Sequence, residues 1–169
     1  MTVRTVILDA ARDYASTHGR LPSLDVLAAA AGVSKGGLMH HFSSRASLVA
    51  ALIVAVLDET DREMRDASGR GEVVDTWLRL SAQPMVGGTP LTTLAVITFG
   101  ANDDLGDTVE QIRDATERWE SLLAAELGSL EKAHMVRLIG DGMLLGRLID
   151  DRAPVVTAEQ VMAVLGKAS

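Results

Sequence analysis

The 169-residue chain contains no cysteine, and its five aromatic residues are Tyr14, Phe42, Trp77, Phe99 and Trp119. The absence of cysteine excludes disulfides, thiolate metal sites and thiol nucleophiles, and it fits a reducing compartment. With so few aromatics the core has to be built from Ala, Leu, Val, Ile and Met, a set that favours helices over sheets. Composition therefore predicts an all-α protein.

Long hydrophobic stretches are also missing. The longest uninterrupted apolar run covers ten residues, Leu48 to Leu57, whereas a membrane-spanning helix needs about 20. The first residues have neither the apolar segment nor the cleavage site of an export signal. We therefore expect a cytoplasmic protein with no membrane partner, in which this run belongs to a buried helix.

Positive charge is scarce, because 16 Lys and Arg residues stand against 23 Asp and Glu residues, a net charge of −7. Taken over the whole chain, this balance is unlike that of a nucleic-acid-binding protein. The charge is uneven, however: residues 1–47 carry five basic and three acidic residues, a net charge of +2, and residues 48–169 carry −9. The sequence therefore predicts two domains, 1–47 and 48–169, of opposite charge.

Apolar residues recur at helical spacing along the chain, and no alternation typical of strands interrupts them. Ser23, Ser34 and Ser44 are candidate N-caps, and Thr157 with Gln160 forms a capping box. The predicted helices cover residues 2–18, 24–31, 35–42, 44–67, 72–83, 90–99, 109–126, 130–149 and 157–166. The helix 130–149 is apolar nearly all round, so it should be enclosed on most sides.

Residues 24–42 have the spacing of a helix-turn-helix motif. Ala28 lies four residues before Gly32, and Leu38 lies six residues after it. A small residue at position 28 allows the second helix to cross closely, and Gly32 supplies the backbone angles of the turn. Because Val33 and Leu38 bury the back of the second helix, its front is left to enter the major groove of DNA.

The front of this recognition helix presents Lys35, Gly36, Met39 and His40. Its cap, Ser34, lies at the helix end whose N–H groups face a phosphate, and Ser44 with Arg45 offers a second such end. The expected DNA-binding residues are Ser34, Lys35, Gly36, Gly37, Met39, His40, Ser44 and Arg45.

The stretch LDVLAAAAGVSKGGLMHHFSSRASL, residues 24–48, resembles the DNA-binding region of tetracycline-repressor (TetR) family regulators. The segment TVILDAARDYASTHG, residues 5–19, is similar to the opening helix of that family. The resemblance implies a three-helix DNA-binding domain followed by a helical regulatory and dimerisation domain, in a bacterial cytoplasmic transcriptional regulator without a cofactor. It further implies a homodimeric repressor that a small-molecule effector releases from a palindromic double-stranded DNA operator.

The recognition helix departs from the family pattern at two positions. Met39 stands where the family usually has Tyr, and Gly37 where it usually has Thr or a similar small residue, and both positions usually contact phosphates. Arg45 replaces the usual Lys, which keeps the charge. Two adjacent glycines each cost about 1 kcal/mol of helix stability. We therefore expect a weaker hold on the DNA backbone, or a close approach of backbone to DNA at Gly36 and Gly37.

Residues 48–169 contain the candidates for an effector pocket and a dimer interface. Flexible methionines suit an adaptable pocket, and they suit ordinary core filling equally. Asp141 interrupts the apolar run 135–149 and needs a partner, for which Arg137, Arg147, His134 and a ligand amine are candidates. We expect an apolar or cationic effector at Met64, Trp77, Met85, Phe99 and Asp141, and dimer contacts at Trp119, Leu123 and Leu145.

Two other hypotheses remain. A ligand-independent regulator or protein-interaction module would have a filled second domain, and 169 residues is short for the family. An enzyme using Asp141 would act without DNA, but no Ser, His and Asp arrangement has the context of a nucleophile, so we expect no enzyme.

Two further motifs are assigned structural roles. The side chains of His40 and His41 lie about 100° apart around a helix, so they are not expected to share a metal. The glycines of GDGMLLG, residues 140–146, are expected to permit close helix packing, because no strand precedes them as in a phosphate-binding loop.

Overall fold

The computed structural model describes residues 2–84, 90–100 and 106–166, and every regular element within these ranges is a helix. The helices are α1 (Val3–His18), α2 (Leu24–Ala30), α3 (Lys35–His41), α4 (Arg45–Ser68), α5 (Val73–Ala82), α6 (Pro90–Gly100), α7 (Thr108–Leu127), α8 (Leu130–Ile149) and α9 (Ala158–Leu165). The predicted all-α fold is confirmed, and each predicted helix end differs from the observed one by at most one residue.

Local caps determine where the short N-terminal helices begin and end. The hydroxyls of Ser23, Ser34 and Ser44 each accept a hydrogen bond from the backbone N–H three residues later, at 3.3, 3.0 and 3.0 Å. Gly19 ends α1 in the left-handed region with φ 62°, and Gly32 makes the turn between α2 and α3 with φ 67°. These are the positions at which the sequence predicted caps and breaks.

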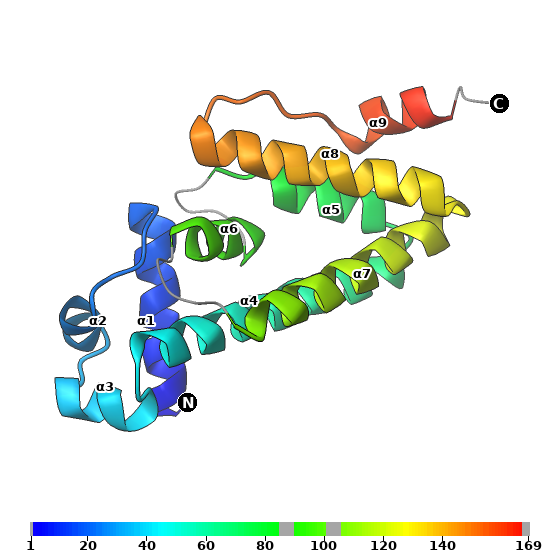
Figure 1. Cartoon of the computed structure of the whole chain (residues 1–169). Coiled ribbons are helices and arrows are strands. Elements are labelled where there is room, and N and C mark those ends of the chain that lie inside the picture. The colour runs from blue at the N-terminus through cyan, green and yellow to red at the C-terminus, as the bar shows by residue number, and fades with distance from the viewer. Residues whose placement is uncertain (1, 85–89, 101–105, 167–169) are drawn as a thin grey trace.

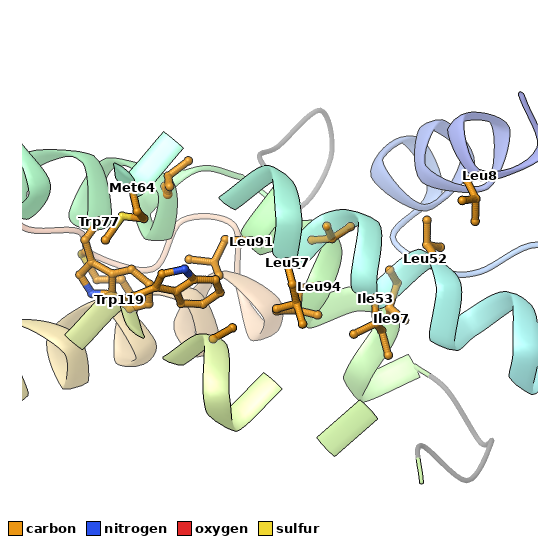
Figure 2. Packing of buried hydrophobic residues seen from close by; sticks show 14 of the residues in the cluster. Leu8, Leu52, Ile53, Leu57, Met64, Trp77, Leu91, Leu94, Ile97 and Trp119 are labelled. Atoms are coloured by element: carbon orange, nitrogen blue, oxygen red, sulfur yellow. The ribbon is translucent and has the colours of Figure 1, made fainter. Parts of the chain in front are cut away.

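A hydrophobic core that follows α4 joins the helix-turn-helix to the rest of the molecule. Figure 2 shows Leu52 near Leu8 of α1, and, further along α4, Leu57 among residues of α6. Met64, near the end of α4, lies among the indole rings of α5 and α7. The apolar run 48–57 is therefore part of a buried helix, as predicted.

The helices are arranged along α4 (Figure 1). Helices α2 and α3 lie on one side of the molecule and α8 with α9 on the other, while the end of α1 reaches the C-terminal part of α8, where Ala15 lies near Leu148. Helix α4 is continuous from Arg45 to Ser68, so the predicted domain boundary at residue 47 falls within its first turn. Within the described ranges no single helix is long and apolar enough to span a membrane, although α3 and α4, bent by 63°, reach that composition together.

Candidate nucleic-acid interface

Helix α3 buries one side and exposes the other. Leu38 has no exposed surface, whereas Lys35, Met39 and His40 are exposed. Val33, at the turn before the helix, packs against the same core. This sidedness is the one predicted for a recognition helix, with an apolar back and a front open to solvent.

The amino group of Lys35 lies 2.9 Å from a carboxylate oxygen of Asp25 in the first turn of α2. Both side chains are well exposed, Lys35 by 62% and Asp25 by 71%. Sequence reasoning missed this partner because the contact joins two helices. The caps did place both residues in the first turn of a helix, since Lys35 directly follows Ser34 and Asp25 follows Ser23 by two residues. The turn packs these two helices together, which brings the two side chains within reach of each other.

Arg45 is half-buried and is part of the fold. Its guanidinium donates a hydrogen bond to the backbone carbonyl of Pro22 at 2.8 Å, which ties the start of α4 to the segment between α1 and α2. Ser44 forms a reciprocal capping box with Ser47 at the same helix end. A phosphate contact by Ser44 or Arg45 stays a prediction, and the structure adds an anchoring role for both.

Arg4 is a basic residue of this region that the sequence did not single out. Its guanidinium carbon lies 5.2 Å from the centroid of the Phe42 ring, a cation–π geometry. Phe42 is the buried C-cap residue of α3, so this contact places an exposed arginine beside the end of the recognition helix. No local pattern predicts it, because 38 positions separate the two residues.

The two glycines of α3 differ in their surroundings. A Cβ added at Gly36 would meet only the hydroxyl of Ser34, at 4.0 Å, whereas one at Gly37 would lie 3.2 Å from that hydroxyl. Gly37 therefore leaves room for the N-cap of its own helix. Gly36 is exposed and open, which is the condition for the predicted close approach of backbone to DNA.

His40 and His41 are both exposed at the last turn of α3. Their rings meet edge-on, with centroids 5.4 Å apart. Across the described ranges, no cluster of three or more His, Cys, Asp or Glu residues could hold a metal ion.

Two residues predicted to line an effector pocket are packed core residues. Met64 is 0% exposed and Trp77 is 1% exposed. The indole N–H of Trp77 donates to the carbonyl of Val136 at 3.2 Å, and its ring lies 5.9 Å from that of Trp119. Neither side chain has surface open to a ligand in this packing, and the role of Met64 and Trp77 in an effector pocket stays a prediction. Met85 and the side chain of Phe99 lie outside the described residues.

The partner of Asp141 is Arg137, whose guanidinium donates to it at 2.5 Å. Arg137 also donates to Glu120 of α7 at 2.7 Å, and His134 lies 3.0 Å from the same carboxylate. Burial raises the pKa of Asp141, against the opposing charge of Arg137. The pKa of Glu120 is lowered: burial raises it, and the hydrogen bonds from His134 and Arg137 outweigh that effect.

Two residues predicted at the dimer interface face the inside of the protomer. Trp119 is 2% exposed and Leu123 is 0% exposed, so neither has surface to offer a second chain. The prediction is wrong for both, because the spacing of threes and fours in α7 marks the side that packs within the chain. Leu145 is 48% exposed, and its interface role stays a prediction.

Helix α8 has one exposed apolar face, which we call the α8 face. It consists of Met135, Leu138, Leu145 and Ile149, whose exposed fractions are 52, 50, 48 and 80%. Their spacing of three, seven and four residues places them on one side of the helix. The expectation that α8 is enclosed on most sides therefore holds for its opposite side alone, in the protomer as described.

Asp61 is a buried polar residue that sequence reasoning missed. Its carboxylate accepts hydrogen bonds from Arg118 at 2.8 Å, from the indole N–H of Trp119 at 2.5 Å and from Arg65 at 3.2 Å. The signal was its position four residues after Leu57, on the buried side of α4. Asp61 thereby joins α4 to α7.

Residues 7–52 match the family model described as bacterial regulatory proteins, tetR family. This segment contains α2 and α3, most of α1 and the first two turns of α4. Residues 7–52 are therefore similar to the DNA-binding region of TetR-family transcriptional regulators. Comparison with curated protein sequences finds no match.

Solved structures extend the likeness to the whole fold. Two crystal structures of NalD, the secondary repressor of the MexAB-OprM multidrug efflux pump in Pseudomonas aeruginosa, each match with a TM-score of 0.63 and 17% identity. The matches cover 98% of this chain and 94% and 95% of the NalD chains. At this identity the likeness is one of architecture, an N-terminal helix-turn-helix followed by a helical domain.

Proposed function

We propose that the protein is a repressor that binds a palindromic DNA operator as a homodimer in the bacterial cytoplasm. The observation that carries the proposal is the exposed front of α3, capped by Ser34 and held by the buried Leu38, within the segment that matches the family. In this proposal residues 1–47 bind DNA. Lys35, Gly36, Gly37, Met39 and His40 meet the DNA at the major groove, where Lys35 pairs with a phosphate at its edge. Ser34, Ser44 and Arg45 lie near further phosphates.

The test is the selection of fragments from genomic DNA by the purified protein at a stated salt concentration. We expect specific fragments to be enriched. Lys35→Ala should weaken binding to them and reduce the slope of log affinity against log salt by about 1, since one phosphate contact is lost. Arg113→Ala, the same charge change on an exposed part of α7, is the matched control. Absence of enrichment by the wild type would contradict the proposal.

Dimerisation is proposed to use the α8 face, each copy packing against the same face of the other. Exposed apolar residues at helical spacing support this, since such a face is typical of helix pairs. Helix α8 lies away from α3 (Figure 1), so a dimer built on α8 leaves both recognition helices uncovered. Leu145 keeps its predicted role, now with Leu138 beside it.

Regulation has two candidates. In the first, a small apolar or cationic effector enters residues 48–169 and shifts α4, and it acts through its different affinities for the two states. In the second, the regulator is ligand-independent with a filled second domain, which the closed packing of Met64 and Trp77 favours.

A thermal-shift assay with a panel of apolar and cationic compounds separates the two candidates. A specific effector at 100 times its Kd stabilises the fold by about 2.7 kcal/mol. No shift across the panel, together with intact operator binding, supports the ligand-independent regulator.

A further inference from the structure

The ion pair between Lys35 and Asp25 lies at the proposed DNA-binding face. Lys35 carries the one permanent charge in the sequence of α3, KGGLMHH. Its amino group, in the first turn of the helix, is 2.9 Å from the Asp25 carboxylate. The charge that the recognition helix offers to DNA is therefore already engaged within the protein.

This ion pair is suited to exchange. Both partners are more than half exposed, and ion pairs in such surroundings contribute about 0–1 kcal/mol. A carboxylate oxygen and a phosphate oxygen accept the same hydrogen bond from an ammonium group. Duplex DNA presents one phosphate charge per ~1.7 Å of its axis, so it competes for Lys35 with many acceptors.

We propose that Asp25 acts as an internal substitute for a DNA phosphate, which engages Lys35 and lowers the affinity of the protein for DNA of any sequence. The proposal rests on the proposed function in DNA binding. When Lys35 turns to a phosphate, the Asp25 carboxylate loses its partner and remains beside a negatively charged surface. Both effects oppose the complex, and both disappear when the charge of Asp25 is removed.

A purely structural role for Asp25 predicts the opposite sign. The residue is in the first turn of α2, where a negative charge interacts favourably with the helix dipole. If that were its whole contribution, removal of the charge would loosen α2 and weaken DNA binding. The direction of the change in affinity therefore separates the two roles.

The experiment measures binding of the full chain by fluorescence anisotropy to two labelled duplexes of equal length. One is a fragment selected from genomic DNA by the wild type, and the other has mixed sequence. Asp25→Asn should tighten binding to both by about two- to fivefold, and Asp25→Ser should do the same. In a Lys35→Met background the gain from Asp25→Asn should shrink to the part that comes from charge repulsion, because no ammonium is left to be released.

Asp13→Asn, the same charge change at an exposed residue of α1, is the matched control and should leave affinity within twofold. Thermal unfolding of each variant checks the fold. Unchanged or weaker binding by folded Asp25→Asn would overturn the inference and leave the proposed function intact. So would a gain that is undiminished without Lys35, or an equal gain in Asp13→Asn. Failure of the wild type to bind either duplex would instead overturn the proposed function itself, and the inference with it.

Discussion

Gly140 illustrates at the residue scale how a missing side chain sets the distance between two helices. A Cβ at this position of α8 would lie 2.7 Å from Cε2 of Trp77 and 2.8 Å from the hydroxyl of Ser81. The sequence predicted that the glycines of GDGMLLG permit close packing, and this is confirmed for Gly140. At Gly142 a Cβ would meet nothing within 4 Å, so packing within the protomer does not require a glycine at that position.

Gly140→Ala should lower the free energy of unfolding by about 1–3 kcal/mol, because the added methyl group overlaps the indole ring and α8 has to move away. Gly36→Ala is the matched control. Its site is open and helical, so it should raise stability by about 0.5–1 kcal/mol. Urea unfolding of the three proteins without DNA measures both changes, and equal stabilities would contradict the packing argument.

Asp61→Asn should lower the free energy of unfolding by about 1–3 kcal/mol. The buried carboxylate accepts hydrogen bonds from donors on α4 and α7. The NH2 group of an asparagine is itself a donor, so it would face Arg118 and Trp119 without accepting from them. Asp66→Asn, an exposed site on the same helix, should change stability by less than about 0.5 kcal/mol. Denaturant unfolding monitored by Trp fluorescence is the measurement, and an equal effect of both variants would contradict a structural role for Asp61.

At the scale of elements, α7 and α8 are joined by a group of charged side chains. Glu120 of α7 accepts from Arg137 of α8, which also pairs with Asp141. Helical periodicity predicted both helices and their ends, because caps and apolar spacing depend on neighbours within about four residues. Periodicity could not predict that Arg137, rather than Arg147 or His134, pairs with Asp141, because that depends on how the helices cross.

The contribution of Glu120 to stability should depend on pH. Its pKa in the fold is lowered from the ordinary 4.5, so its stabilising effect is present above that pH and is lost as the pH falls through the folded-state pKa. The pKa of Asp141 is raised, so the folded state binds that proton more readily, and the contribution of Asp141 to stability increases as the pH falls. Glu120→Gln should therefore be less stable than the wild type at pH 7, and the difference should shrink below pH 4.5.

Unfolding free energies of Glu120→Gln and the wild type across this pH range measure the effect. Glu117→Gln, an exposed site on the same helix, controls for the change in net charge. A difference between Glu120→Gln and the wild type that stays constant with pH would show that the hydrogen bonds of Glu120 do not depend on its charge.

At the scale of the whole molecule, charge and exposed apolar surface are unevenly distributed. The net charge of −7 is the sum of +2 over residues 1–47 and −9 over residues 48–169. Helices α2 and α3 lie on one side of the molecule and α8 on the other (Figure 1). The acidic part should be repelled by DNA, which leaves contact with DNA to the first 47 residues.

Leu138→Glu and Leu145→Glu should convert the proposed dimer into a monomer, since each places a charge in an apolar contact made twice across the two-fold axis. Both sites are about half exposed, so the protomer should still fold. Val54→Glu, at an exposed apolar site on α4, is the control and should remain dimeric. Sedimentation at several protein concentrations measures the state, and a wild-type monomer or unchanged dimers would contradict the proposed interface.

The sequence by itself determined the helices, their caps, the helix-turn-helix and the charge of its two parts. It also placed Lys35, Met39 and His40 on the exposed front of the recognition helix. All of these depend on residues close together in the chain, where spacing and caps decide the structure. Only the tertiary structure decided that Asp25 engages Lys35, that Asp61 joins α4 to α7, and that Met64 and Trp119 face inward. The physical reason is that an apolar stripe specifies which side of a helix is covered, but packing between distant segments specifies what covers it.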